Sequence, residues 1–152
     1  YQDMGLKIKK ISKSSYEFNC KTLKPIKKIS TKEFPGYPTD LQAQLIATQL
    51  KSALKSKVVE NIFENRFIHI PELRRFGANL SIIGKTVTIH KTPNLFGAEV
   101  MATDIRASFS LIIAAMMSKG TTVINRIYHL DRGYEDFDLK LKKCGVNISR
   151  KK

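Results

Sequence analysis

The chain has 152 residues and is 42% hydrophobic, which is enough for one ordinary domain with an apolar core. Its longest apolar run, 111–117, is too short to cross a membrane. Its two cysteines, Cys20 and Cys144, are far apart in the sequence and lack the spacing of a zinc site, which suggests a reducing, cytoplasmic setting. The formal net charge of +14 keeps nucleic-acid binding open, but the lysines lack interleaved aromatic triplets and are more simply a solvated surface.

The first strong helix signal begins at Thr39. This residue is a favourable N-cap, and Gln42, three residues later, completes a capping box. Apolar residues then recur at mostly helical spacing as far as Leu54. The sequence therefore predicts a helix over about 41–54.

Strand and helix patterns alternate after this helix. A β-rich stretch over 58–63 precedes a short helix over about 71–76. Gly77 suits the position just after a helix end, where φ is positive. The alternating stretch over 80–90, interrupted by Gly84-Lys85, predicts an antiparallel hairpin.

A second set of similar elements follows. The sequence predicts a strand near 98–101, a helix over 105–117, a β-rich stretch over 122–128 and a helix over about 134–143. Of the two long helices, the one over 105–117 has the cleaner helical period. Gly145 follows the last helix, at another position that suits positive φ.

The two sets are copies of one repeat. Asp40 and Asp104 lie 64 residues apart (104 − 40), whereas Gly77 and Gly145 lie 68 residues apart (145 − 77). Four residues are therefore inserted in the second copy, near 129–133. A third copy of the repeat's ending stands at the start of the chain, so we expect a piece of a longer protein that begins inside a repeat.

The repeat divides the chain into three segments. We interpret 1–33 as the tail of one repeat with a connection, and 34–93 and 94–152 as two further units of one domain. Each full unit is expected to run strand, helix, strand, helix, strand, strand.

Several charged residues are candidates for chemistry. Asp40 and Asp104 occupy the first turns of their helices, where a carboxylate is favoured by the helix dipole whether or not it also takes a proton in a reaction. Arg66, Arg106 and Arg132 are candidates for gripping an anion, because a guanidinium group holds a carboxylate or phosphate in a fixed plane. For Arg132, an ordinary ion pair with a neighbouring carboxylate is an equal alternative.

Four motifs resemble the carboxy-terminal part of the UDP-N-acetylglucosamine 1-carboxyvinyltransferases, in the enolpyruvyl transferase family. Their order and spacing match over nearly the whole chain, although the first thirty residues match only in pattern. The motifs are Pro38-Thr39-Asp40-Leu41-Gln42-Ala43-Gln44, Phe63-Glu64-Asn65-Arg66-Phe67-Ile68-His69, Met101-Ala102-Thr103-Asp104-Ile105-Arg106-Ala107-Ser108 and Arg126-Ile127-Tyr128-His129-Leu130-Asp131-Arg132-Gly133-Tyr134-Glu135.

The resemblance implies a fold and a reaction. The fold is an α/β (α+β) inside-out barrel of repeated βαβαββ units with the helices packed inside, and the family has two such domains. The reaction transfers the enolpyruvyl group of phosphoenolpyruvate to the 3-hydroxyl of UDP-N-acetylglucosamine and releases phosphate. It is the first committed step of peptidoglycan synthesis, and so of cell wall biogenesis, cell shape and cell division. The resemblance implies no metal and no cofactor, because phosphoenolpyruvate is a cosubstrate, and no nucleic-acid or membrane partner.

The resemblance also assigns roles to residues. It implies that Asp40 is the general base beside the sugar hydroxyl, and that Arg132 grips phosphoenolpyruvate. The residues expected to contact the nucleotide sugar or to line the cleft between the domains are Ile62, Phe63, Arg66, Asp104 and Arg106.

Parts of the family's site are not found in this sequence. The mobile loop with the reactive cysteine, and the lysine–asparagine pair that binds phosphoenolpyruvate, belong to the other domain. We therefore expect the chain alone to be inactive. The nearest alternative function is 5-enolpyruvylshikimate 3-phosphate synthase, against which the stretch Glu64-Asn65-Arg66-Phe67-Ile68-His69 argues. A basic nucleic-acid-binding module is a remote alternative that rests on charge alone.

Overall fold

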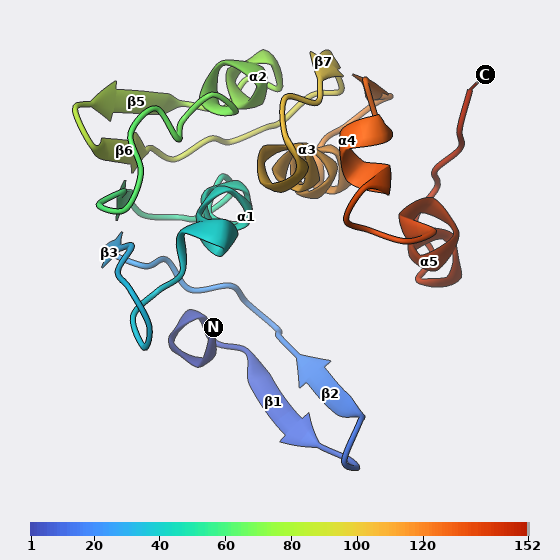
Figure 1. The fold of residues 1–152 in the computed structure, drawn as a ribbon, viewed down its shortest axis with the longest axis horizontal. Helices are drawn as coiled ribbons and strands as arrows, with labels where there is room; N and C mark the ends of the chain where they lie inside the picture. The colour runs from blue at the N-terminus through green and yellow to red at the C-terminus, as the bar shows by residue number, and fades with distance from the viewer. Residues whose placement is uncertain (152) are drawn as a thin grey trace.

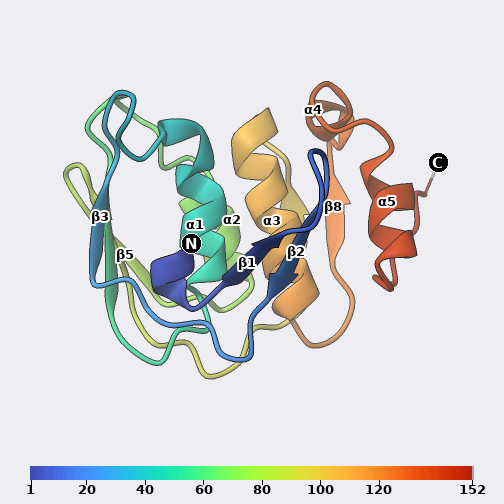
Figure 2. The ribbon, with the colours of Figure 1, turned by 90° about the horizontal axis from the view of Figure 1, so that it is seen from below.

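Helices from the middle of the chain lie at the centre of the molecule with short strands around them, and the helices near the carboxy terminus lie at one edge (Figure 2). The computed structural model describes residues 1–151. Helices α1 (Gln42–Thr48) and α3 (Ile105–Met117) pack side by side at the centre. All residues of α1 from Gln42 to Ala47 are buried, as expected for a helix with neighbours on every side.

One sheet carries four strands in the order β3, β4, β6, β5. The pair β3–β4 is parallel, and the other two pairs are antiparallel. From β3 to β6 the chain runs β3, α1, β4, α2, β5, β6, which is the order expected for one repeat unit. The boundaries proposed at 33/34 and 93/94 stay predictions. The bounds are β3 (Lys28–Ser30), β4 (Ser56–Val59), α2 (Ile70–Arg75), β5 (Leu80–Ile83) and β6 (Thr86–Ile89).

The second set of elements is built differently at its end. Strands β7 (Glu99–Met101) and β8 (Val123–Asn125) pair in parallel on either side of α3 in the sequence. The predicted helix over 134–143 is wrong in its first turn, because α5 (Phe137–Lys143) starts only after Asp136, whose φ is 47°. Residues of the predicted insertion form a separate short helix, α4 (Tyr128–Asp131).

The amino-terminal residues form a hairpin that projects from the body (Figure 1). A short 3-10 helix, η1 (Gln2–Met4), leads into antiparallel strands β1 (Lys7–Lys10) and β2 (Tyr16–Asn19), whose residues are all exposed. Met4 is the exception in this region, since it is buried in the main core. Three glycines that end the three copies of the repeat all have left-handed backbone, with φ of 92°, 85° and 87° at Gly5, Gly77 and Gly145.

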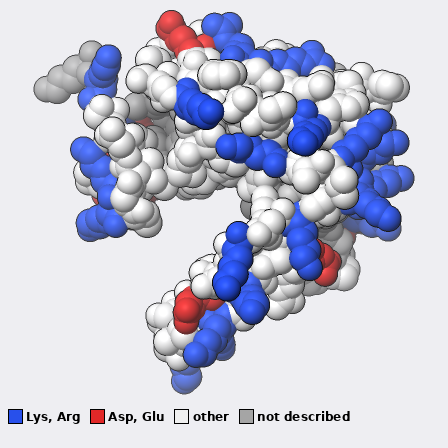
Figure 3. All heavy atoms as spheres, turned by 180° about the vertical axis from the view of Figure 1, so that it is seen from behind, with Lys and Arg blue, Asp and Glu red and all other residues white. Residues whose placement is uncertain are grey.

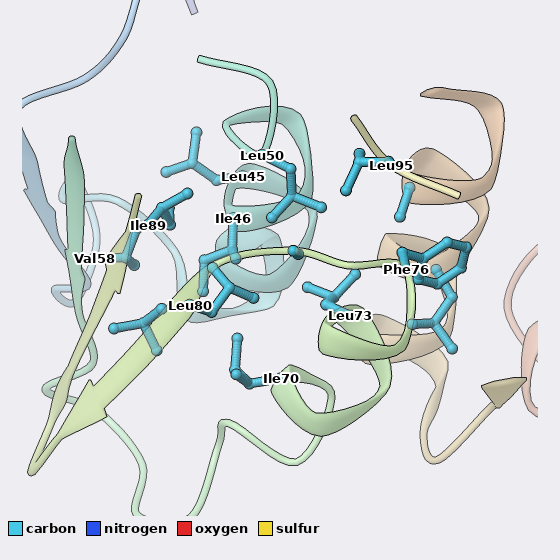
Figure 4. Packing of buried hydrophobic residues seen from close by; sticks show 14 of the residues in the cluster. Leu45, Ile46, Leu50, Val58, Ile70, Leu73, Phe76, Leu80, Ile89 and Leu95 are labelled. Carbon is cyan, nitrogen blue, oxygen red and sulfur yellow. The ribbon is translucent and has the colours of Figure 1, made fainter. Parts of the chain in front are cut away.

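The main core lies between α1, α2 and the four-stranded sheet (Figure 4). Side chains from all three elements point into it, and the interior is apolar where they meet. Burial of such side chains is the main favourable term in folding, at roughly 1.5–3 kcal/mol for each large apolar residue. The residues labelled there are Leu45, Ile46, Leu50, Val58, Ile70, Leu73, Phe76, Leu80, Ile89 and Leu95.

The start and end of α1 differ from the prediction. Residues Thr39–Leu41 form a 3-10 turn, η2, and the Thr39 side chain does not cap the helix, so the predicted capping box is wrong. The helix ends at Thr48, before the predicted end at 54. Gln49, the next residue, is buried. Its Oε1 accepts hydrogen bonds from Ile26 N (3.0 Å) and Ser56 Oγ (3.2 Å) and so links the helix end to two other segments.

Lys and Arg side chains are spread over the face in Figure 3, along both the body and the projecting hairpin. Few Asp or Glu side chains lie between them in this view. Among the described helices, none combines the length and the apolar character needed to span a bilayer.

Candidate functional site

Asp40 is held at the surface by two guanidinium groups. Its Oδ1 accepts a hydrogen bond from Arg66 Nη2 at 3.1 Å and another from Arg106 Nε. The Asp40 side chain is 60% exposed, so these ion pairs contribute at most about 1 kcal/mol to stability each. Both contacts use the same oxygen, and the other carboxylate oxygen lies outside them. The arrangement therefore fixes the carboxylate in place while one oxygen stays open.

Arg66 reaches Asp40 from the loop that follows β4. Asn65, just before it, has a φ of 53°, a left-handed conformation that asparagine tolerates better than most residues. The Arg66 guanidinium also lies over the Phe63 ring, 4.7 Å from its centroid. This loop thus brings Phe63 and Arg66 together with Asp40, as three of the residues that the sequence singled out.

Arg106 reaches Asp40 from the first turn of α3. Asp104 is the N-cap of that helix, and its Oδ1 accepts hydrogen bonds from the amides of Arg106 (2.8 Å) and Ala107 (2.9 Å). Asp104 therefore orients the turn that carries Arg106. Asp40 and Asp104, which the repeat places at equivalent positions, have different roles in the structure, since only Asp104 caps a helix.

A buried carboxylate that was not among the candidates from the sequence binds Thr39, the residue next to Asp40. Glu60 is only 1% exposed, and its two oxygens accept four hydrogen bonds. The donors are Thr31 Oγ1 (2.9 Å), Ile62 N (2.9 Å) and Phe63 N (3.2 Å) to Oε1, and Thr39 Oγ1 (2.9 Å) to Oε2. Burial by itself would raise the pKa of Glu60, but these hydrogen bonds outweigh it and hold the pKa below its ordinary value.

The predicted nucleotide-sugar contacts, Ile62 and Phe63, form the turn held by Glu60. Ile62 is half-buried, whereas the Phe63 side chain is 51% exposed. Phe63 and Arg66 line a surface hollow, whose other wall includes Ile82 and Lys85 of the β5–β6 hairpin.

His69 is buried beneath the same loop. Within residues 1–151 neither of its ring nitrogens has a hydrogen-bond partner. Burial lowers the pKa of His69 to about 4; the charge of Asp104 and the nearby backbone of Arg66 oppose this shift, and the charge of Arg66 adds a smaller lowering. The ring is therefore neutral near pH 7.

Arg132 lies outside the cluster around Asp40. The Arg132 residue is exposed. Its two acidic neighbours form ion pairs with other residues: Asp131 with Arg150 at 2.6 Å, and Glu135 with Lys140 at 3.5 Å. No ion pair of Arg132 with residues 1–151 is present. The guanidinium group is thus available for an anion.

The residue after Arg132 packs against α3. A Cβ added at Gly133 would lie 2.0 Å from Ile105 Cδ1, so a larger residue there would require the end of the Ile105 side chain to shift. Since Ile105 is the first residue of α3, the backbone beside Arg132 is placed at the same end of the helix as Asp104 and Arg106.

Residues 1–151 contain no group of three or more His, Cys, Asp or Glu side chains arranged to hold a metal ion. Cys20 and Cys144 are exposed free thiols.

The chain matches a known protein family over most of its length. The sequence model of EPSP synthase (3-phosphoshikimate 1-carboxyvinyltransferase) matches residues 1–141.

Curated relatives carry the name expected from the four motifs. UDP-N-acetylglucosamine 1-carboxyvinyltransferase of Afipia carboxidovorans is 56% identical over 122 residues, which are 80% of this chain and 28% of that protein. The protein of the same name from Campylobacter lari is 51% identical over 141 residues, or 92% of this chain and 34% of that protein. The predicted resemblance is confirmed, and the chain spans about a third of the length of these relatives.

Two solved structures resemble the fold. The enolpyruvyl transferase NikO from Streptomyces tendae matches 97% of this chain and 34% of its own, with a TM-score of 0.86 and 26% identity. EPSP synthase from Acinetobacter baumannii matches 81% of this chain and 30% of its own, with a TM-score of 0.61 and 14% identity, which bears on the fold alone. The predicted fold class is confirmed, although residues 1–151 form separate sheets and not a closed barrel.

Proposed function

Because the chain belongs to the EPSP synthase (3-phosphoshikimate 1-carboxyvinyltransferase) family, we propose that it serves an enolpyruvyl transfer reaction, in which UDP-N-acetylglucosamine is the acceptor. The enolpyruvyl group of phosphoenolpyruvate is transferred to the 3-hydroxyl of the sugar, and phosphate is released. The observation that carries this choice of acceptor is the identity of 51–56% to relatives named for that reaction. Those relatives are about three times as long as the matched segment, so the proposed activity belongs to a longer protein.

Asp40 is proposed as the general base. The sugar hydroxyl attacks the central carbon of phosphoenolpyruvate while the methylene carbon gains a proton, and the hydroxyl proton passes to a carboxylate. Loss of phosphate and of one methyl proton then restores the double bond. The position of Asp40 supports its role, because Arg66 and Arg106 hold one oxygen and the other is open to accept the proton.

The arginines suit the anionic substrates. Arg132, with no ion pair to the described residues, is proposed to grip the carboxylate or phosphate of phosphoenolpyruvate. Ile62 and Phe63 are proposed to contact the nucleotide sugar at the turn after β4. Asp104, Arg66 and Arg106 line the same cleft and set the position of Asp40.

The other wall of the cleft is proposed to come from a second domain. The curated relatives have about two thirds of their length outside the matched segment, which supports a partner domain that supplies the remaining groups. We expect the chain by itself to be inactive. We expect the complete enzyme to need no metal or cofactor and to act in peptidoglycan synthesis in the cytoplasm. Nucleic acid and membranes are not part of this proposal.

A chimera can test the proposed reaction. In it, this chain replaces the matching segment of the Campylobacter lari relative, with which it aligns over 141 residues. We expect phosphate release from phosphoenolpyruvate with UDP-N-acetylglucosamine and none with shikimate 3-phosphate. A folded chimera that uses only shikimate 3-phosphate would overturn the choice of acceptor.

Asp40→Asn in the chimera tests the base. General acid–base catalysis contributes roughly 10²-fold or more, so kcat is expected to fall by about that factor while thermal unfolding stays cooperative. Asp3→Asn, at an exposed acidic residue of η1, is the matched control. Near-normal kcat in Asp40→Asn would reject Asp40 as the base.

A further inference from the structure

Glu60 is an unusual residue to bury. It directly follows β4 and is 1% exposed, yet no Lys, Arg or His of the described chain forms an ion pair with it. A buried carboxylate without a cation is unfavourable unless hydrogen bonds satisfy it fully. Here two hydroxyls and two amides supply four such bonds.

The second copy of the repeat has no carboxylate at the position given by the 64-residue offset. That position (60 + 64) is Ile124, an apolar residue in the middle of β8 that packs against the core, whereas Glu60 follows the last residue of β4. In that copy the aspartate caps its own helix. In the first copy Glu60 binds the side chain of Thr39 instead, and Asp40 does not cap a helix.

The four donors come from both sides of the Asp40–Arg66 ion pair. Thr39 is the residue next to Asp40, and Thr31 belongs to the segment that precedes it. Ile62 and Phe63 begin the loop that carries Arg66. One carboxylate therefore ties the segment of the base to the loop of its arginine.

We infer that Glu60 is a positioning residue for the proposed reaction. It fixes the Asp40 segment against the turn at Ile62 and Phe63, and so sets where the base lies relative to the nucleotide sugar. This inference rests on the proposed function for its catalytic meaning. Arg132 lies on the second copy and shares no hydrogen bond with Glu60, so the grip on phosphoenolpyruvate is unaffected.

Two substitutions at this site separate positioning from packing. Glu60→Ile copies the residue of the second repeat but leaves both amides and both hydroxyls without their acceptor. Glu60→Gln keeps an oxygen for Thr31, Ile62 and Phe63, and its amide can donate to the hydroxyl of Thr39. We expect Glu60→Ile to lose the positioning and Glu60→Gln to rescue most of it.

The kinetic test uses the chimera. Glu60→Ile is expected to lower kcat by about 10- to 100-fold, the range expected when a catalytic group is misplaced by about an ångström, and to raise KM for UDP-N-acetylglucosamine with little change for phosphoenolpyruvate. Thr39→Val breaks only the bond on the Asp40 side, so it should lower kcat and leave both KM values nearly unchanged. Glu17→Gln, on the exposed strand β2, is the control.

Hydrogen–deuterium exchange on the full 152-residue chain provides a readout independent of activity. Glu60→Ile should speed exchange at 38–41 and 61–66, whereas Glu60→Gln should not. Unchanged exchange there, or a Glu60→Ile chimera that only melts earlier with wild-type kcat and KM, would overturn the inference. If Glu60→Ile does not fold, Thr39→Val decides, and wild-type kcat in it would also overturn the inference. An inactive wild-type chimera would instead count against the proposed function, and exchange would still test Glu60.

Discussion

Two aspartates at equivalent sequence positions differ in the groups that bind them. Asp104 accepts hydrogen bonds from two backbone amides of its own helix, whereas Asp40 accepts hydrogen bonds from two guanidinium groups that come from other segments. The local sequence around both predicts the same helix-start role. In the first copy Glu60, which directly follows β4, accepts a hydrogen bond from Thr39, the residue next to Asp40.

The cap at Asp104 gives a prediction about stability. Asp104→Ala should reduce the free energy of unfolding by about 0.5–2 kcal/mol, because two amides of α3 lose their acceptor. Asp104→Asn should cost much less, since asparagine caps almost as well. Urea unfolding of the purified chain checks both. Equal losses for Ala and Asn would contradict the capping role.

Burial of His69 predicts a pH dependence of stability. Its pKa is about 4 in the folded chain against an ordinary value of 6.5, so between these values the unfolded state binds more protons. Stability is therefore complete above about pH 6.5 and falls as the pH drops towards 4. Between pH 7 and 5 the expected loss is about 2 kcal/mol.

Urea unfolding at several pH values measures this loss, with His69→Gln as the comparison. The variant should show a flatter curve between pH 7 and 5. Glu60, whose pKa is lowered, adds a loss of the same sign at more acidic pH, which is why the test stays above pH 5. Parallel curves for the two proteins would exclude His69 as the cause.

Most residues of the candidate site could be singled out from the sequence, and Glu60 could not. Asp40, Arg66 and Arg106 lie in continuous motifs, and the structure brings them into contact. Glu60 is a single acidic residue in a β-rich stretch, and its partner Thr31 lies 29 residues earlier. One signal was present, because an acid stands where the second copy has Ile124.

At the scale of elements, α3 was predicted well and α1 was not. The helix of 105–117 agrees with α3 (Ile105–Met117), because its apolar period is unbroken and an aspartate caps it. The stripe of 41–54 overestimated α1, because Gln49 has a tertiary role that apolar periodicity does not reveal. The predicted strand over 58–63 also ends early, at Val59, since Glu60 turns the chain.

The contact between α4 and α3 is open to a direct test. Gly133→Ala places a methyl group against the end of the Ile105 side chain, which must shift, and should destabilise the chain by about 1 kcal/mol. In the chimera it should also raise KM for phosphoenolpyruvate, because Arg132 moves with the displaced turn. A double variant with Ile105→Ala should recover part of both losses. If the effects of the two single variants simply add in the double variant, the turn that carries Arg132 does not depend on this contact.

At the scale of the whole molecule, the repeat predicted the order of elements better than their assembly. The run from β3 to β6 follows the expected unit, and the three glycines at the repeat endings share positive φ. Sequence periodicity could not predict how the sheets join. They form separate groups of two, four and two strands, since strand pairing depends on contacts distant in sequence.

The shared oxygen of Asp40 has a consequence for engineering. Arg66 comes from the first of the two full copies and Arg106 from the second, so the surroundings of one carboxylate are composed jointly by both. Recombination could exchange a single copy with that of a distant relative. Asp40 of one protein would then face the Arg106 position of another, whose surroundings differ. The smallest interchangeable module is therefore the two copies taken together, and crossover points between them should yield folded proteins that are poor catalysts.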